Sequence, residues 1–186
     1  SKIYTEISKN VFPELRRARF VTNYYFKNFT DEELVELSNT AINVLDEPAL
    51  LRVAGQSTDA DRKVLLYNLA AEKFNSQKAL YNLAALYIAK NEPANAERTL
   101  ARLEDKNSAE VQNLLGVAAM LRSDYETASK LFAKAGNAAA AQNLAAIDIY
   151  NGNYAAAASK LKNTTGTNAA LANILNGDLK AASAAL

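Results

Sequence analysis

The sequence predicts an all-α protein built from stacked helical hairpins, and two observations carry this prediction. Of its 186 residues, 49% are apolar and 22% are charged, with only 6 Gly and 3 Pro to interrupt helices. Residues 147–161 (IDIYNGNYAAAASKL) and 172–186 (ANILNGDLKAASAAL) also repeat one order of residue types, 25 positions apart. A self-similar period of this length is typical of stacked-repeat proteins.

Residues 1–29 differ from the rest and are predicted to form a leader segment. A short helix with Pro13 in its first turn precedes residues 18–26 (ARFVTNYYF), whose period-two alternation predicts a β-strand. A lone strand leaves its backbone groups unpaired, and no later segment offers a partner. We therefore expect the strand either to end an upstream domain of a longer chain or to pair with a second copy in a homodimer.

Residues 30–186 are predicted to form the helical domain, and residues 31–75 are its divergent leading section. Thr30 and Glu33 stand in the order of a capping box, which starts a helix. A second helix is expected from Asp46 to about Gly55, and a third from a cap at Ser57 or Thr58 to about Phe74.

From residue 77 the predicted helices come in pairs. Pro93 suits a first turn, Ser123 is read as a cap, and Gly136 and two Asn-Gly steps mark helix ends. The expected pairs are 77–90 with 93–105, 108–121 with 124–135, 138–150 with 154–162, and 168–176 with 178–186.

Each pair follows one packing rule. The first helix carries Asn-Leu and then small residues, as in NLAA at 82–85 and NLLG at 113–116. The second helix carries a small residue and, one turn later, a large apolar one, so that the helices approach closely and the large residue fills the gap between pairs. These residues are Ala96 and Leu100, Ala128 and Phe132, Ala157 and Leu161, and Ala182 and Leu186.

These units resemble tetratricopeptide repeats (TPRs). The residues that carry the resemblance are Leu80, Leu83, Ala84, Tyr87, Ala96, Leu100 and Leu103 in the first unit, and Leu115, Gly116, Ala128, Phe132 and Ala135 in the second. Residues 77–135 match the family most clearly and 138–186 are a degenerate version. The first-helix aromatic and a closing proline are absent throughout, and the later Tyr is lost after Tyr87. The resemblance implies a right-handed α-α superhelix.

The order of the segments resembles the C-terminal part of certain bacterial cell-envelope lipoproteins. In these proteins an OmpA-like domain precedes a TPR array, as FPELRRARFVTNYYF and FTDEELVELS precede the repeats here. The resemblance implies a location in the periplasm, or tethered to the outer membrane. The peptidoglycan-binding signature of the OmpA-like domain is not in this sequence, so no glycan-binding residues are inferred.

Composition argues against several other classes of protein. The chain has no Cys, His or Trp, and no motif joins its Ser and Lys residues, so we expect neither an enzyme nor a metal or cofactor site. A net charge of +1 does not favour nucleic acid binding. No apolar run reaches the length of a membrane span.

The remaining candidate for a binding site is the concave surface of a TPR stack, which is lined by the first helix of each pair. Because its residues are mostly apolar, we expect a protein or peptide partner held by contacts that depend little on salt. By family resemblance the groove residues are Lys78, Tyr81, Ala85, Ile88, Asn113, Val117, Met120, Gln142, Ile149 and Tyr150.

Lys78 and Asn82 also match part of the clamp with which some TPRs bind a C-terminal carboxylate. Ala139 and Asn143 occupy the places of the clamp's basic pair, so a carboxylate clamp is not expected. The sequence thus predicts a non-catalytic protein–protein interaction scaffold. The alternatives are a glycan-binding envelope protein on the same scaffold and a structural spacer between domains.

Overall fold

The computed structural model describes residues 2, 5–6, 9 and 28–186 of the chain. Its contacts divide the chain into two compact units, Ser1–Thr30 and Asp31–Leu186. The strand expected over 18–26 and most of the short helix before it lie outside the described residues. Within 28–186 all regular structure is helical, which confirms the all-α prediction for this part of the chain.

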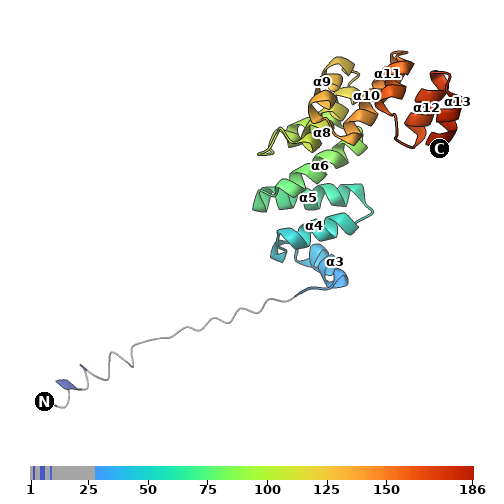
Figure 1. Cartoon of the computed structure of the whole chain (residues 1–186). Coiled ribbons are helices and arrows are strands. Elements are labelled where there is room, and N and C mark those ends of the chain that lie inside the picture. The colour runs from blue at the N-terminus through green and yellow to red at the C-terminus, as the bar shows by residue number, and fades with distance from the viewer. Residues whose placement is uncertain (1, 3–4, 7–8, 10–27) are drawn as a thin grey trace. The chain divides into compact units, whose positions relative to one another are not determined.

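The second unit opens with three α-helices and one short 3-10 helix, in which the first α-helix packs against both the 3-10 helix and the second α-helix, and the second packs against the third (Figure 1). Asp46 caps one of these helices by accepting a hydrogen bond from the amide of Ala49 at 3.0 Å. The next helix is capped by Asp59 rather than by the predicted Ser57 or Thr58. The elements are α3 (Asp31–Thr40), η1 (Ile42–Val44), α4 (Glu47–Gln56) and α5 (Ala60–Phe74).

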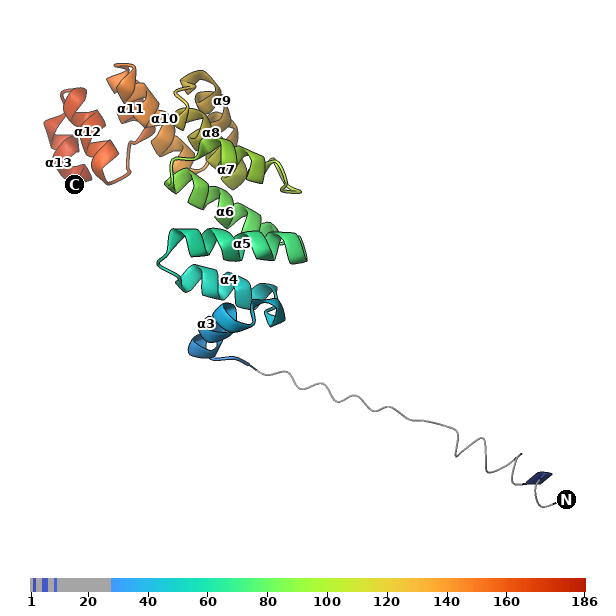
Figure 2. The same ribbon diagram turned by 180° about the vertical axis from the view of Figure 1, so that it is seen from behind.

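Four helical hairpins follow, and each helix packs against the next one in the chain (Figures 1 and 2). The first helices of successive hairpins also contact one another, so α6, α8, α10 and α12 adjoin in that order. The hairpins are α6 (Gln77–Ala89) with α7 (Pro93–Leu100), α8 (Ala109–Leu121) with α9 (Tyr125–Ala135), α10 (Ala138–Tyr150) with α11 (Tyr154–Lys160), and α12 (Thr167–Leu175) with α13 (Leu179–Ala185).

The turns inside the hairpins share one backbone geometry. The second residue after each first helix has a positive φ, at Asn91, Ser123, Gly152 and Gly177. The two Asn-Gly steps therefore form turns as predicted, because glycine adopts this conformation without a steric penalty. The sequence suggested Ser123 as the cap of α9, but this prediction was wrong. Ser123 is the left-handed turn residue, and Asp124 caps the helix by accepting from the amide of Thr127 at 3.1 Å.

The predicted packing rule holds for three hairpins. Ala96, Ala128 and Ala157 are fully buried, and so are the large residues one turn later, Leu100, Phe132 and Leu161. In the last hairpin Ala182 is buried but Leu186 is 90% exposed. The prediction was wrong there. Leu161 also follows the last residue of its helix, but α12 packs over it, whereas no described helix packs over Leu186.

The core changes in composition along the stack. Leucines fill it in the first half, whereas the core around α10–α13 consists of six alanines and one large residue, Leu161. Less apolar area is therefore buried per residue towards α13.

Candidate functional site

The candidate site lies where α7 ends earlier than the sequence predicted. The expected helix 93–105 stops at Leu100, and the chain continues as a turn and a loop to Ser108. Leu103 turns back into the core and is 6% exposed. The sequence contains one indication of this loop, the run Asp-Lys-Asn-Ser at 105–108. Asp, Asn and Ser favour turns over helix interiors.

Two glutamines hold the loop in place. The side-chain oxygen of Gln77, the first residue of α6, accepts a hydrogen bond from the backbone amide of Glu104 at 2.9 Å. On the other side, Gln112 of α8 is buried, and its Nε2 donates to the carbonyl of Lys106 at 2.6 Å. The loop is thus tied to the first helices of two successive hairpins.

The end of the loop is shaped by the start of α8. The Asp105 carboxylate accepts hydrogen bonds from the backbone amides of Asn107 at 2.9 Å and Ser108 at 3.1 Å. Ser108 then caps α8 by accepting from the amide of Val111. These bonds fix the direction of the first turn of α8, and with it the position of the Val111 side chain.

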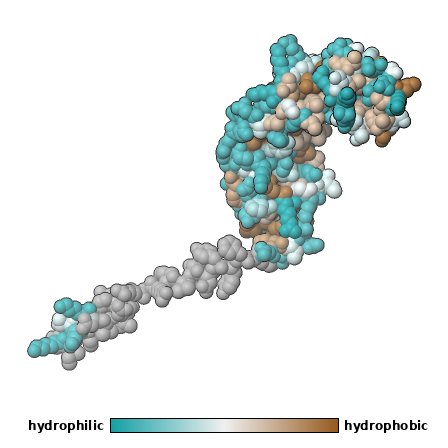
Figure 3. Space-filling model, viewed as in Figure 1, coloured by the Kyte–Doolittle hydropathy of each residue, from teal (hydrophilic) through white to brown (hydrophobic). Residues whose placement is uncertain are grey.

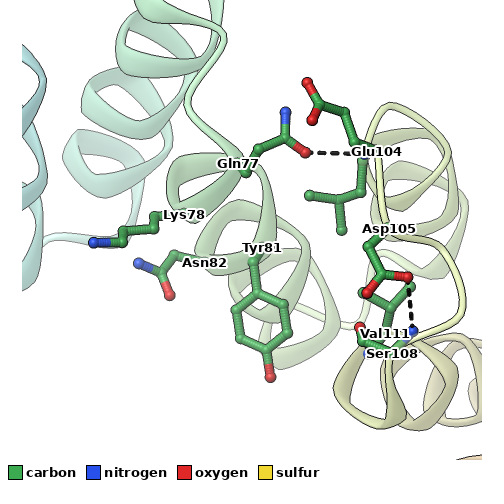
Figure 4. Close-up of a pocket in the computed structure, with 9 residues that line it drawn as sticks. Gln77, Lys78, Tyr81, Asn82, Glu104, Asp105, Ser108 and Val111 are labelled. Carbon is green, nitrogen blue, oxygen red and sulfur yellow. Dashed lines mark hydrogen bonds between the residues drawn. The ribbon is translucent and has the colours of Figure 1, made fainter.

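The loop, α6 and α8 together line an open pocket of about 540 Å³ (Figure 4). Buried Leu103 and Val111 supply apolar surface to it, and the half-buried ring of Tyr81 faces Asp105, Ser108 and Val111 across the pocket in Figure 4. The residues that line it are Gln77, Lys78, Tyr81, Asn82, Leu103, Glu104, Asp105, Ser108 and Val111.

Polar groups surround this apolar interior. Lys78 and Asn82 lie exposed on α6, and the exposed carboxylates of Glu104 and Asp105 lie on the loop side. Exposed charges of this kind are screened by water and salt and contribute mainly to orientation and specificity. The arrangement is suited to holding a side chain with an apolar body and a polar or charged end.

The structure places the ten predicted groove residues on the expected helices but brings only two of them, Lys78 and Tyr81, to the pocket. Three others pack in part against the hydrophobic core: Val117 and Met120 of α8 and Ile149 of α10. The remaining five are Ala85 and Ile88 on α6, Asn113 on α8, and Gln142 and Tyr150 on α10. The loop residues of the pocket were missed because helix was predicted through residue 105.

Along the same row of helices, α8 and α10 are linked by a pair of asparagines. The Asn143 side-chain amide donates to the Asn113 side-chain oxygen at 3.0 Å, and both residues are half-buried. The Asn143 amide thus bridges two helices of successive hairpins.

The shifted pKa values of the second unit lie outside the pocket. Asp61 and Lys90 form an ion pair of 2.6 Å between α5 and α6, whose hydrogen bond lowers the pKa of Asp61 and raises that of Lys90. Among the described residues no group of three or more acidic side chains is placed to hold a metal ion. In the same part of the chain, no helix has both the length and the apolarity needed to cross a bilayer.

No protein-family model matches the chain, and no curated protein matches it significantly in sequence. The geometry of the stack and its pocket therefore carries the functional argument.

Proposed function

We propose that the chain is a non-catalytic protein–protein interaction scaffold. In this proposal an extended peptide of a partner protein lies along the row formed by α6, α8, α10 and α12, on the concave face of a TPR-like right-handed superhelix. One of its side chains enters the pocket between α6 and α8.

The pocket is the observation that carries the proposal. It combines a largely apolar lining with Tyr81 at its side and exposed polar groups around it, the arrangement that orients a bound side chain. The pocket also opens between the first helices of two hairpins. A peptide anchored in it would therefore contact further half-buried side chains of α8. Helical repeats typically bind partners along such extended surfaces.

The resemblance to TPR lipoproteins of the bacterial cell envelope supports a periplasmic role, with or without an outer-membrane tether. A glycan-binding protein and a spacer between domains are the two alternatives.

The test is selection of peptides from a random phage-displayed library on immobilised chain 1–186, followed by affinity measurements with Tyr81→Ala. Loss of the Tyr81 ring should lower the affinity for the selected peptides by about tenfold or more, as loss of an aromatic residue at the centre of an interface does. Tyr87→Ala is the matched control, because Tyr87 lies on the same helix, is also half-buried, and does not line the pocket.

Peptides that bind all three proteins equally would contradict a binding site at the pocket. If no peptide is selected, a glycan array probed with the same proteins decides between the alternatives. Glycan binding that Tyr81→Ala abolishes supports the glycan-binding protein, and no binding at all supports the spacer.

A further inference from the structure

Charged side chains are unevenly placed around the pocket between α6 and α8. The loop contributes two exposed carboxylates, those of Glu104 and Asp105, and α6 contributes one ammonium group, that of Lys78. In Figure 4 the Lys78 side chain points away from the loop, whereas Asp105 lies across the pocket from the Tyr81 ring. The side of the pocket between Tyr81 and the loop is therefore acidic.

The polar groups on this side that are available to a ligand are hydrogen-bond acceptors. Gln77 is already bonded at both ends, because its oxygen accepts from a backbone amide of the loop and its Nε2 donates to the carbonyl of Asn75 at 3.2 Å. Oδ1 of Asp105 accepts two backbone amides at the end of the loop, and no described residue donates to Oδ2. The Glu104 carboxylate has one long contact, 3.4 Å from Nδ2 of Asn75. A ligand group that donates hydrogen bonds and carries a positive charge is complementary to these carboxylates.

Other charges near the loop do not reverse this preference. Lys106 is exposed in the loop, and Lys134 of α9 donates to a loop asparagine at 2.8 Å, but neither lysine lines the pocket. Glu110, exposed in the first turn of α8, adds a negative charge. The positive end of the α8 dipole favours anions, but the backbone amides of Ser108 and Val111 already donate to side chains there. The two lining carboxylates therefore decide which sign of charge the pocket favours.

The interior of the pocket fits the hydrocarbon part of a basic side chain. Leu103 and Val111 are buried residues that present apolar surface, and the half-buried Tyr81 ring faces Val111 across the pocket (Figure 4). Arginine and lysine bury their methylene chains on apolar surface and keep the charged end at polar groups or in water. The guanidinium group of arginine can also stack on an aromatic ring.

We propose that the peptide side chain which enters this pocket is basic, an arginine or a lysine. This inference rests on the proposed function, because it names the side chain that the interaction scaffold recognises. The methylene chain lies against Leu103, Val111 and the Tyr81 ring, and the charged end meets the carboxylates of Asp105 and Glu104. Arginine binds more tightly than lysine, since its planar group stacks on the ring while it donates several hydrogen bonds. Because both carboxylates are exposed, the charge acts more on specificity than on affinity.

The probes for this proposal are peptides selected on chain 1–186 from the random phage-displayed library. Hydrophobic side chains also reach the surface over the C-terminal hairpins (Figure 3), where Tyr150 and Leu179 are each 70% exposed, so a peptide can bind there without using the pocket. Peptides that bind Tyr81→Ala more weakly than the parent are therefore retained. The anchor is the peptide residue whose replacement by alanine abolishes this difference.

We expect the anchor to be arginine or lysine. Citrulline in place of arginine keeps the shape and removes the charge, and norleucine in place of lysine does nearly the same. Either replacement should lower the affinity for the parent chain by about three- to tenfold, because it removes the attraction of two exposed carboxylates.

Asp105→Asn and Glu104→Gln test the two carboxylates. Asp105→Asn keeps an oxygen for the two loop amides, so it removes charge without releasing the loop. Each variant should bind the basic peptides about two- to fivefold more weakly than the parent does. The citrulline and norleucine peptides should bind parent and variants almost equally, as a double-mutant cycle requires of a direct interaction. Glu110→Gln is the matched control, because Glu110 is exposed near the start of α8 but does not line the pocket.

Glu104→Lys tests the sign of the charge. The loop is bonded to Gln77 through the Glu104 backbone amide, so the side chain can be changed without breaking that bond. The variant should bind basic anchors about fivefold more weakly, and it should bind peptides with glutamate at the anchor position more tightly than the parent does. Peptides that need the Tyr81 ring but insert an apolar or acidic side chain would overturn this inference and leave the proposed function standing. Selection of no peptide, or of peptides that all bind independently of Tyr81, would overturn both.

Discussion

Gly116 of α8 and Phe132 of α9 approach so closely that a Cβ atom on Gly116 would lie 2.5 Å from Cε1 of the phenylalanine ring. Phe132 is fully buried, and its ring is held among the alanines of the surrounding core. The glycine is therefore required by packing, although glycine inside a helix costs about 1 kcal/mol of helix propensity relative to alanine.

Gly116→Ala should destabilise the fold. Overpacking a fixed core costs about 1–3 kcal/mol, which exceeds the gain of about 1 kcal/mol in helix propensity, so a net loss of about 1 kcal/mol is expected. Urea unfolding measures it. Gly55→Ala is the control, since a Cβ there meets nothing within 4 Å and the same change should stabilise α4. A Gly116→Ala variant that is as stable as the parent would show that the ring can move.

The asparagine pair between α8 and α10 should contribute a measurable coupling. Asn113→Ala and Asn143→Ala each remove one partner of a 3.0 Å hydrogen bond and should each cost about 0.5–1.5 kcal/mol. In a double-mutant cycle the combined variant should lose less than the sum, because the second substitution has no bond left to break. Strict additivity in urea unfolding would mean that the two amides do not interact.

Gln77→Ala should release the loop that closes the pocket. Its side chain accepts the hydrogen bond of the Glu104 amide, so hydrogen exchange at Glu104 should become faster by tenfold or more, given roughly 1.4 kcal/mol for such a bond. Exchange inside α12, far from the loop, serves as the internal control. Unchanged exchange at Glu104 would indicate that Gln112 alone holds the loop.

The cap of α9 should make part of the stability depend on pH. The hydrogen bond from the Thr127 backbone amide lowers the pKa of Asp124 below its ordinary value of 3.8. A lowered pKa in the folded state gives stability that is present above pH 3.8 and is lost as the pH falls through the folded-state value. Asp124→Asn keeps a capping oxygen but does not titrate.

The thermal midpoint of the parent should therefore exceed that of Asp124→Asn at neutral pH, and the difference should shrink as the pH is lowered past 3.8. Thermal scans by circular dichroism at a series of pH values measure it. A difference that stays constant across the series would exclude ionisation of Asp124 as its cause.

The hairpins could be predicted from the sequence because their signals are local. Asn-Gly at 151–152 and 176–177 marks turns by backbone preference alone, and the buried alanines of the second helices follow a fixed period. The pocket could not be predicted, because it depends on where α7 stops. Helix-forming residues continue past Leu100, and the helix ends there because Leu103 packs back into the core.

The contact between Tyr125 and Tyr150 could not be predicted from the sequence. Tyr150 is predicted as a groove residue from its position along α10, and that position alone does not say which neighbouring ring it meets. The two rings are tilted by 37° with centroids 4.8 Å apart, and this contact depends on how α9 and α10 pack.

The alanine-rich core around α10–α13 has a consequence for how the chain unfolds. In a linear array of repeats each hairpin is stabilised only by itself and its neighbours, so hairpins that bury little apolar area open first. A partner bound to these hairpins would add its binding free energy to the least stable part of the array, so that the ordering of the last hairpins would rise and fall with the concentration of that partner.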